Sequence, residues 1–243
     1  MLSSGATCPL PIGTPYGHFS YQSEVGGISP GTTFSYTCDA GYVVVGTNPV
    51  TCQANLTYDD VTTCKKTCPA VTTVADSTYA TTSTLGSTIY DGVTVTYTCN
   101  ANFHLVGNSV LTCLSDGAYD LVVPVCKAIC PTLTLTDGIA TPSSTPIIEN
   151  VVITFSCNAN FYLQGNTGAT CLTTGLYDAA APTCEAICNS PATVTNGSFT
   201  YTSPLIEDVQ VTFSCDVGFA MVGTSTATCQ YNHTLSSSAP KCE

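Results

Sequence analysis

The stretch YTCNANFHLVGNSVLTC, from Tyr97 to Cys113, returns further along the chain as FSCNANFYLQGNTGATC, from Phe155 to Cys171. Both copies keep a cysteine at each end of the same interval, an Asn-Phe dipeptide and a lone glycine after it. A working part of an enzyme is seldom repeated within one chain, whereas a structural unit often is. The stretch therefore predicts a chain built from repeated structural units.

The cysteines show how far the repeat extends. All 16 fall into four sets of four, at positions 8, 38, 52 and 64; 68, 99, 113 and 126; 130, 157, 171 and 184; and 188, 215, 229 and 242. The second and third cysteines are separated by 13 residues in every set, and three residues separate each set from the next. We therefore expect an N-terminal stub (1–7) and four units, 8–64, 68–126, 130–184 and 188–242.

Each unit is too small to bury a sufficient hydrophobic core, so disulfides are expected to compensate. Two bridges per unit, each closing a loop of tens of residues, would contribute about 3–4 kcal/mol apiece. The close CxxC pairs and nearby histidines of zinc sites are absent from the sequence. No metal and no cofactor is predicted.

The local pattern indicates β-strands. Alternation of β-branched or aromatic residues with Thr, Ser or Gln marks GVTVTYTC (Gly92–Cys99), VVITFSC (Val151–Cys157) and VQVTFSC (Val209–Cys215). No segment has helical periodicity with caps, so the units are predicted to be all-β.

A turn is expected after the second cysteine of each unit. A residue that tolerates the left-handed backbone region stands there, namely Gly41, Asn102, Asn160 or Gly218. The aromatic that follows (Tyr42, Phe103, Phe161 or Phe219) is predicted to start the next strand and to face the small core. Four residues later a glycine (Gly46, Gly107, Gly165 or Gly223) suits a turn or bulge.

Composition excludes several classes of partner. Charged residues make up 8% of the 243 residues, there is no Arg, and the formal net charge is −12. Nucleic acids and anionic glycans need clustered positive charge, so neither is expected to bind.

Sixteen cysteines at regular spacing indicate an oxidising, extracellular compartment, secreted or at a cell surface. No apolar run is long enough to span a membrane, and Met1–Thr7 is too short and polar for a secretion signal. We expect that a signal has been removed or that a longer precursor exists.

The order Cys, Tyr/Phe-x-Cys, Gly-Tyr/Phe-x-x-x-Gly, Thr-Cys, aromatic, Pro-x-Cys resembles the sushi module, also called the complement control protein module. The resemblance covers essentially the whole chain, four times over. The family's usual Trp after the third cysteine is replaced by Tyr58, Tyr119, Tyr177 and Leu235, and the Pro two before the last cysteine is Pro124, Pro182, Pro240 but Thr62 in the first unit. Tyr keeps an aromatic plug, and Leu235 predicts a more loosely packed fourth module.

The resemblance also implies the disulfide pairing, which spacing leaves open among three alternatives per unit. Sushi modules join the first cysteine to the third and the second to the fourth. Carried over, the pairs are Cys8–Cys52, Cys38–Cys64, Cys68–Cys113, Cys99–Cys126, Cys130–Cys171, Cys157–Cys184, Cys188–Cys229 and Cys215–Cys242. A three-residue linker spans only about 10 Å, so an elongated tandem array is expected, a semi-stiff rod with Ile129 and Ile187 packed in its junctions.

Residues suited to catalysis are scarce. Every cysteine is expected to have a structural partner, and the histidines, His18, His104 and His233, lie in three different modules. Asp59, Asp120 and Asp178 each follow the Tyr that replaces Trp, and Asp60 adds a second carboxylate. A calcium loop needs several oxygen ligands at a defined spacing, so a turn capped by Asp is preferred. No catalytic residues are predicted, and the chain is not expected to be an enzyme.

Three sequons predict N-glycosylation, at Asn55, Asn196 and Asn232. Asn55 and Asn232 occupy the same place, three residues after the third cysteine of their modules, which indicates an exposed turn. Clusters of Thr and Ser at 81–84 and 141–146 are weaker candidates for O-glycans.

Two functional hypotheses remain. The favoured one is a non-catalytic extracellular rod, a structural or adhesive building block of a fibre or coat that self-associates end to end. With 44% apolar and 8% charged residues, much uncharged surface must be covered by glycans or neighbouring copies. The alternative is a complement-regulator-like or receptor-like binding protein that recognises another protein. The lack of a basic patch, which many of that family's binders use, weighs against it.

Overall fold

The computed structural model describes residues 5, 7–20, 27–58, 62–143 and 145–243 and contains strands but no helix in that part of the chain. Module 1 (8–64) holds β1 (Gly17–Ser20), β2 (Thr33–Cys38), β3 (Tyr42–Val45), β4 (Val50–Thr51) and β5 (Thr63–Lys66). Module 2 (68–126) holds β6 (Ser77–Thr81), β7 (Thr94–Cys99), β8 (Phe103–Val106) and β9 (Val110–Thr112), and β10 (Val125–Cys130) continues into module 3. Module 3 (130–184) adds β11 (Gly138–Thr141), β12 (Ile147–Ile148), β13 (Val152–Cys157), β14 (Phe161–Gln164), β15 (Gly168–Thr170) and β16 (Thr183–Ala186). Module 4 (188–242) holds β17 (Gly197–Thr200), β18 (Gln210–Cys215), β19 (Met221–Val222), β20 (Thr226–Thr228) and β21 (Lys241–Cys242).

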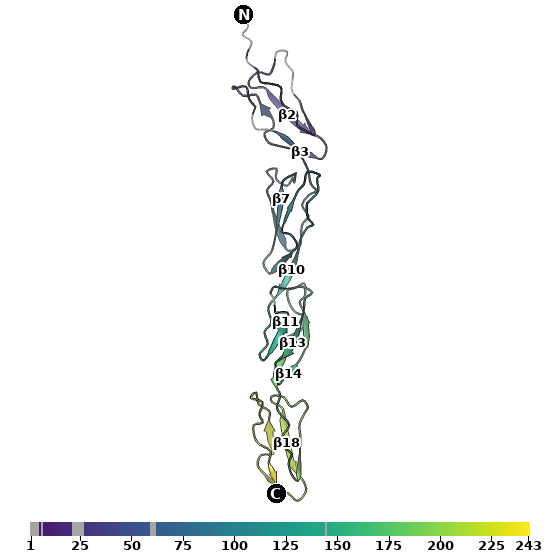
Figure 1. Cartoon of the computed structure of the whole chain (residues 1–243), viewed down its shortest axis with the longest axis vertical. Coiled ribbons are helices and arrows are strands. Elements are labelled where there is room, and N and C mark those ends of the chain that lie inside the picture. The colour runs from purple at the N-terminus through teal and green to yellow at the C-terminus, as the bar shows by residue number, and fades with distance from the viewer. Residues whose placement is uncertain (1–4, 6, 21–26, 59–61, 144) are drawn as a thin grey trace. The chain divides into compact units, whose positions relative to one another are not determined.

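Every module has the same antiparallel three-stranded sheet. Its middle strand is β2, β7, β13 or β18, each labelled in Figure 1, and the orders are β1-β2-β4, β6-β7-β9, β11-β13-β15 and β17-β18-β20. In module 3, Gly138 pairs with Cys157 on one side of β13, and Val152 pairs with Thr170 on the other. The predicted all-β fold is confirmed.

Strand alternation builds each core. Along β13 the side chains alternate between solvent and interior, so that Ile153 and Phe155 are buried. They pack with Ala169 and with Cys130 and Cys171. Modules 1, 2 and 4 have separate cores of the same kind. Each core is small, as the length of the modules requires.

Disulfides complete each core. The structure joins Cys8 to Cys52, Cys38 to Cys64, Cys68 to Cys113, Cys99 to Cys126, Cys130 to Cys171, Cys157 to Cys184, Cys188 to Cys229 and Cys215 to Cys242. No cysteine of the described residues is free. The two bridges of a module overlap in the sequence, because one cysteine of each lies between the two cysteines of the other.

Three tyrosines fasten the start of a module to its far loop. The hydroxyl of Tyr119 donates to the Pro69 carbonyl at 2.9 Å, and that of Tyr177 donates to Pro131 at 2.8 Å. Tyr58 donates in the same way to Pro9 in module 1. Module 4 has Leu235 and Asn189 at the two positions, so this hydroxyl contact is missing there. Leu235 packs against the module 4 core instead.

The predicted left-handed turns are present. Before the aromatic, φ is 83° at Gly41, 69° at Asn102 and Asn160, and 95° at Gly218. The later glycines, Gly46, Gly107, Gly165 and Gly223, also have positive φ. Asn replaces Gly in two modules because it tolerates this region better than other residues do.

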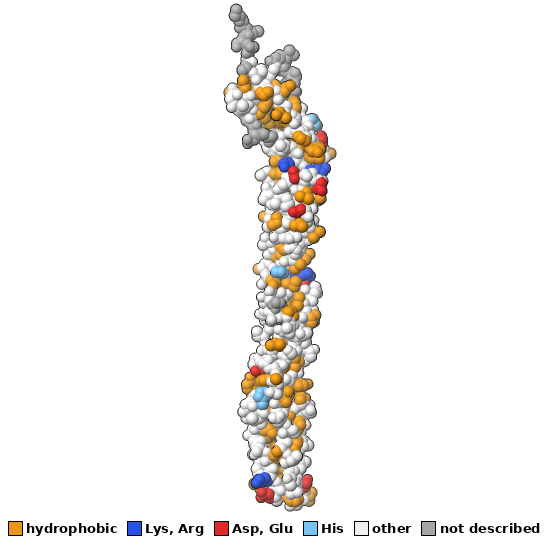
Figure 2. All heavy atoms as spheres, in the orientation of Figure 1, with side chains coloured by type: hydrophobic (Ala, Val, Ile, Leu, Met, Phe, Trp, Pro, Cys, Tyr) orange, Lys and Arg blue, Asp and Glu red, His pale blue; other side chains and the backbone are white. Residues whose placement is uncertain are grey.

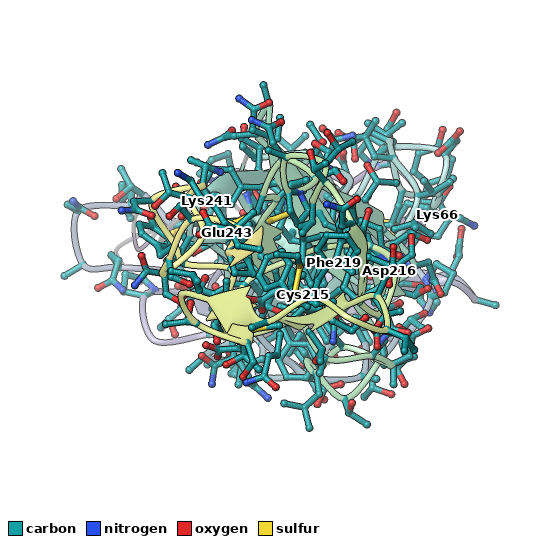
Figure 3. The ribbon with its side chains drawn as sticks, turned by 90° about the horizontal axis from the view of Figure 1, so that it is seen from below. Lys66, Cys215, Asp216, Phe219, Lys241 and Glu243 are labelled. Atoms are coloured by element: carbon teal, nitrogen blue, oxygen red, sulfur yellow. A yellow bond between two sulfur atoms is a disulfide. The ribbon has the colours of Figure 1, made fainter. Side chains whose placement is uncertain are left out.

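The expectation that the following aromatic faces the core is wrong. None of the four rings belongs to a module core. Tyr42 stacks on Tyr16 with ring centroids 4.5 Å apart, and Lys66 Nζ lies 4.7 Å from the Tyr42 ring centre. Phe219, beside Asp216 in Figure 3, is 42% exposed. The turn directs these rings to the end of a module rather than into it.

Contacts divide the chain into two compact units, residues 1–126 and 127–243. In the first unit, Thr67 N donates to the Gly41 carbonyl at 3.0 Å, and Lys65 pairs with Asp91 at 3.1 Å. These contacts join module 2 to the preceding linker and module 1.

In the second unit, the linker residue Ile187 bridges to Ile206 of module 4, and its N–H donates to Asn160 of module 3 at 2.9 Å. The Phe161 ring contacts the rings of Tyr231 and His233. Modules 3 and 4 are therefore joined by both backbone and side chains.

Candidate protein-binding surface

Five exposed aliphatic side chains define the module 2 aliphatic surface: Val106, Val110, Leu121, Val122 and Val125. Val122 is 84% exposed, and the other four are 38–49% exposed. Figure 2 shows the wider setting, in which the visible face has few charged side chains among hydrophobic and uncharged polar ones. Exposed apolar side chains that gather in one region of a surface often mark a binding site.

Adjacent strands place two of these valines together. Val106 is the last residue of β8, and Val125 is the first residue of β10, the neighbouring strand. The next residue along, Gly107, lies so close to Pro124 that a Cβ there would come within 3.3 Å of the Pro124 Cα. The end of β8 and the start of β10 therefore lie side by side, which places Val106 next to Val125.

A hydrogen-bonded turn brings the next residues alongside. Asp120 N donates to the Thr112 carbonyl at 3.0 Å, and Thr112 N donates to Asp120 Oδ1 at 2.7 Å. This reciprocal pair lays Leu121 beside β9, whose first residue is Val110. Leu111, which follows Val110 on β9, points into the core.

Modules 3 and 4 show that the fold does not need five aliphatic residues here. Counted from the second cysteine, the same five positions hold Gln164, Gly168, Ala179, Ala180 and Thr183 in module 3, and Val222, Thr226, Ser237, Ser238 and Lys241 in module 4. In module 4, Ser237 Oγ donates to the Thr226 carbonyl at 3.1 Å, and Thr224 Oγ1 donates to Ser237 Oγ at 2.8 Å. A polar contact thus serves module 4 where module 2 exposes Val110 and Leu121.

The aspartates that follow the tyrosines act in turns. Asp178 Oδ1 accepts from Thr170 N at 2.7 Å, as Asp120 does from Thr112 N. Within the described residues, no group of three or more His, Cys, Asp or Glu side chains could hold a metal ion. Asp59 and Asp60 lie outside the described residues.

The three histidines have separate surroundings. His18 pairs with Thr37 in the first sheet, and His104 lies on β8. His233 packs edge-on against Phe161 at 4.9 Å between ring centres, with its Nδ1 3.3 Å from the Ile187 carbonyl oxygen. His233 therefore serves the junction between modules 3 and 4.

A second surface feature lies at this junction. Tyr231 donates to Asp137 Oδ2 at 2.5 Å, and this bond to a carboxylate raises the pKa of the Tyr231 hydroxyl. A shallow, open depression beside it is lined by Glu207, Asp208, Thr228, Cys229, Gln230, Tyr231 and Asn232. The sequon residue Asn232 is one of these lining residues, so a glycan there would occupy space at this depression. Module 2 contains no sequon.

Taken together, small all-β modules, each with its own core and two disulfides that overlap in sequence, define a modular, disulfide-rich class of protein. The model of the Sushi repeat (SCR repeat) family matches residues 8–64, 68–126, 130–184 and 188–242. The chain belongs to this family. No helix of the described residues is long and apolar enough to cross a membrane.

The relatives are larger proteins. The chain is 31% identical to complement receptor type 2 of Homo sapiens, over 98% of this chain and 25% of that protein. It is 30% identical to the sushi, von Willebrand factor type A, EGF and pentraxin domain-containing protein 1 of Mus musculus, over 97% of this chain and 6% of that protein. It is 29% identical to the C4b-binding protein alpha chain of Rattus norvegicus, over 88% of this chain and 38% of that protein. The chain thus spans well under half the length of these relatives.

Proposed function

We propose that this chain is a non-catalytic extracellular binding protein that recognises another protein through the module 2 aliphatic surface. The observation that carries the proposal is that module 2 exposes aliphatic side chains at five positions where module 3 carries small or polar residues and module 4 keeps only Val222. The relatives named as a receptor and as a C4b-binding protein support this class of function. They support it better than the fibre building block that composition favoured.

The chemistry of the surface indicates the chemistry of the partner. None of its five side chains is charged, and the nearby Asp120 carboxylate already accepts a backbone hydrogen bond. Burial of apolar area stabilises a complex by about 25 cal/mol per Å². The partner is therefore expected to present an apolar patch, and affinity should change little with ionic strength, because long-range charge attraction contributes little.

Module 4 supplies the residues for a test variant. Val110→Thr, Leu121→Ser and Val122→Ser together give module 2 the residues that module 4 carries at those positions. Ile139→Thr and Val152→Thr remove two exposed aliphatic side chains from module 3 and form the matched control. Because all five changed side chains are exposed, both variants should unfold at nearly the same temperature as the unchanged chain.

The experiment has two stages. Proteins that cross-link to the unchanged chain in the fluid or on the cells of its own source are identified, and one is purified and titrated by calorimetry. We expect saturable binding that weakens at least tenfold, about 1.4 kcal/mol, in the module 2 variant and is unchanged in the control. Equal affinity in both variants would place the binding site elsewhere.

Light scattering of the chain alone distinguishes the fibre hypothesis. If the unchanged chain associates with itself as its concentration rises, and the module 2 variant does not, the surface joins copies of this chain. That result would contradict recognition of a different protein.

A further inference from the structure

The structure separates the three sequons into two kinds. In Asn55-Leu56-Thr57, Asn55 Oδ1 accepts from Thr57 Oγ1 at 2.6 Å and from Thr57 N at 3.2 Å. In Asn232-His233-Thr234, Asn232 Oδ1 accepts from Thr234 Oγ1 at 2.7 Å and from Thr234 N at 3.1 Å. The middle residues also agree, since φ is 65° at both Leu56 and His233. Two modules thus hold the same exposed sequon turn.

This turn presents the nitrogen that glycosylation uses. Both hydrogen bonds end on the carboxamide oxygen, which leaves Nδ2 without a protein partner among the hydrogen bonds of the described residues. Donors on the oxygen polarise the amide and make its N–H protons easier to remove. The bonds span only two residues, so they need no tertiary structure and can form in a chain that has just been synthesised.

Asn196-Gly197-Ser198 is held differently. Its residues 197 and 198 already belong to β17, and Ser198 Oγ bonds to Ser214 Oγ at 2.9 Å across the strand pair. The Asn196 carbonyl accepts from Asp216 N at 2.9 Å. The Ser198 hydroxyl is therefore committed to the neighbouring strand and not to Asn196.

The disulfide of the module closes over the same segment. A Cβ at Gly197 would lie 2.5 Å from the Ser214 carbonyl oxygen and 2.8 Å from Cys242 Sγ. Cys242 is bonded to Cys215, at the end of the paired strand β18. Once β17 pairs and this bridge forms, the backbone at 197 is packed closely against Ser214 and Cys242.

We propose that Asn55 and Asn232 are the N-glycosylation sites of this chain, and that pairing of β17 with β18 withdraws Asn196 from modification. In the transfer, the bond between Asn Nδ2 and the first sugar carbon forms as that carbon's bond to the diphosphate of a lipid-linked oligosaccharide breaks. The diphosphate leaves with the bonding electrons, and the transferase accepts the proton from Nδ2. Modules 2 and 3 contain no sequon and carry no N-glycan.

The test is site occupancy in the full chain secreted by eukaryotic cells. Peptide N-glycosidase in ¹⁸O-water labels each formerly glycosylated asparagine, and mass spectrometry measures the labelled fraction at each site. Most copies of Asn55 and Asn232 should be labelled, and only a minority of Asn196. An empty Asn55 or Asn232, or equal occupancy at all three, would overturn the proposal.

Two variants identify the cause. Cys215→Ser with Cys242→Ser delays closure of module 4 and should raise occupancy at Asn196 while Asn55 stays unchanged; the intracellular pool is measured as well, in case secretion fails. Ser198→Thr keeps the sequon hydroxyl, adds one methyl group beside it, and should leave the occupancy of Asn196 well below that of Asn232. If Ser198→Thr alone makes the two sites equal, or if the double serine variant leaves Asn196 unchanged, strand pairing is not the cause.

Discussion

The tyrosine that replaces the family's usual Trp gives the sharpest stability prediction, and module 3 is the place to test it. Tyr177→Phe removes only the hydroxyl that donates to the Pro131 carbonyl at 2.8 Å. A typical hydrogen bond contributes about 0.5–1.5 kcal/mol, and water can replace this one in part because Tyr177 is half-buried. We expect Tyr177→Phe to lower the free energy of opening of module 3 by about 1 kcal/mol.

Tyr177→Leu gives module 3 the residue that module 4 carries at this position. The ring that packs against the module 3 core is then lost with the hydroxyl. Complete truncation of a buried large side chain costs about 2–5 kcal/mol, and a half-buried Tyr shortened to Leu should fall near the lower end, about 2 kcal/mol. In the reverse change, Leu235→Tyr should raise the protection of module 4, because Asn189 offers its carbonyl where module 3 has Pro131.

Hydrogen exchange measured by mass spectrometry suits this question, because it reports the opening of each module separately within the intact chain. The amides of β13 report on module 3 and those of β7 on module 2. Tyr162→Phe is the matched control, since Tyr162 lies on β14 of the same module, is exposed, and makes no hydroxyl bond among the described residues. Unchanged β13 exchange in Tyr177→Phe, or an equal loss in Tyr162→Phe, would refute the role of this hydrogen bond.

The same tyrosine gives a pH dependence. Burial raises the pKa of the Tyr177 hydroxyl above its ordinary value of 10.0. A group whose pKa is higher in the folded state stabilises that state fully below the unfolded pKa, and the stabilisation is lost as pH rises through the folded pKa. Module 3 should therefore lose protection above pH 10, and Tyr177→Phe should lose less.

Two further predictions concern the second unit. Lys127 bonds Glu149 at 2.9 Å and holds the pKa of that carboxyl below its ordinary value; Lys127→Gln should raise the Glu149 pKa in an NMR titration, and an unchanged midpoint would contradict the ion pair. Ile153 is 1% exposed and Ile139 is 57% exposed, so Ile153→Ala should destabilise module 3 by about 2–5 kcal/mol. Ile139→Ala should change the same β13 exchange by less than about 0.5 kcal/mol, and similar losses in the two variants would contradict the assigned core.

Much of the fold could be predicted because the same sequence pattern is repeated in four modules. Cysteine spacing marked the repeats, alternation in segments such as Val151–Cys157 marked the middle strands, and Gly or Asn marked the left-handed turns. The direction of the aromatic after each turn was predicted wrongly. A single module cannot show that Phe161 meets Tyr231 and His233 of the next one.

The candidate surface could not be predicted, for a physical reason. Leu121, Val122 and Val123 form a continuous apolar run, which by itself suggests burial. In the fold only Val123 packs against the core, while Leu121 and Val122 face solvent. Likewise, the bond from Tyr119 to Pro69 joins residues far apart in sequence. The sequence carried a sign of this hydrogen bond, because module 4 lacks both the Tyr and the Pro. Only the fold shows that the two residues are in contact.

The most direct test of the proposed binding surface is a hydrogen-exchange comparison of the full chain alone and saturated with its purified partner. We predict slower exchange in β8, in β9 and across 121–126, with modules 1 and 4 unchanged. Protection confined to another module, with module 2 exchanging as in the free chain, would contradict the account.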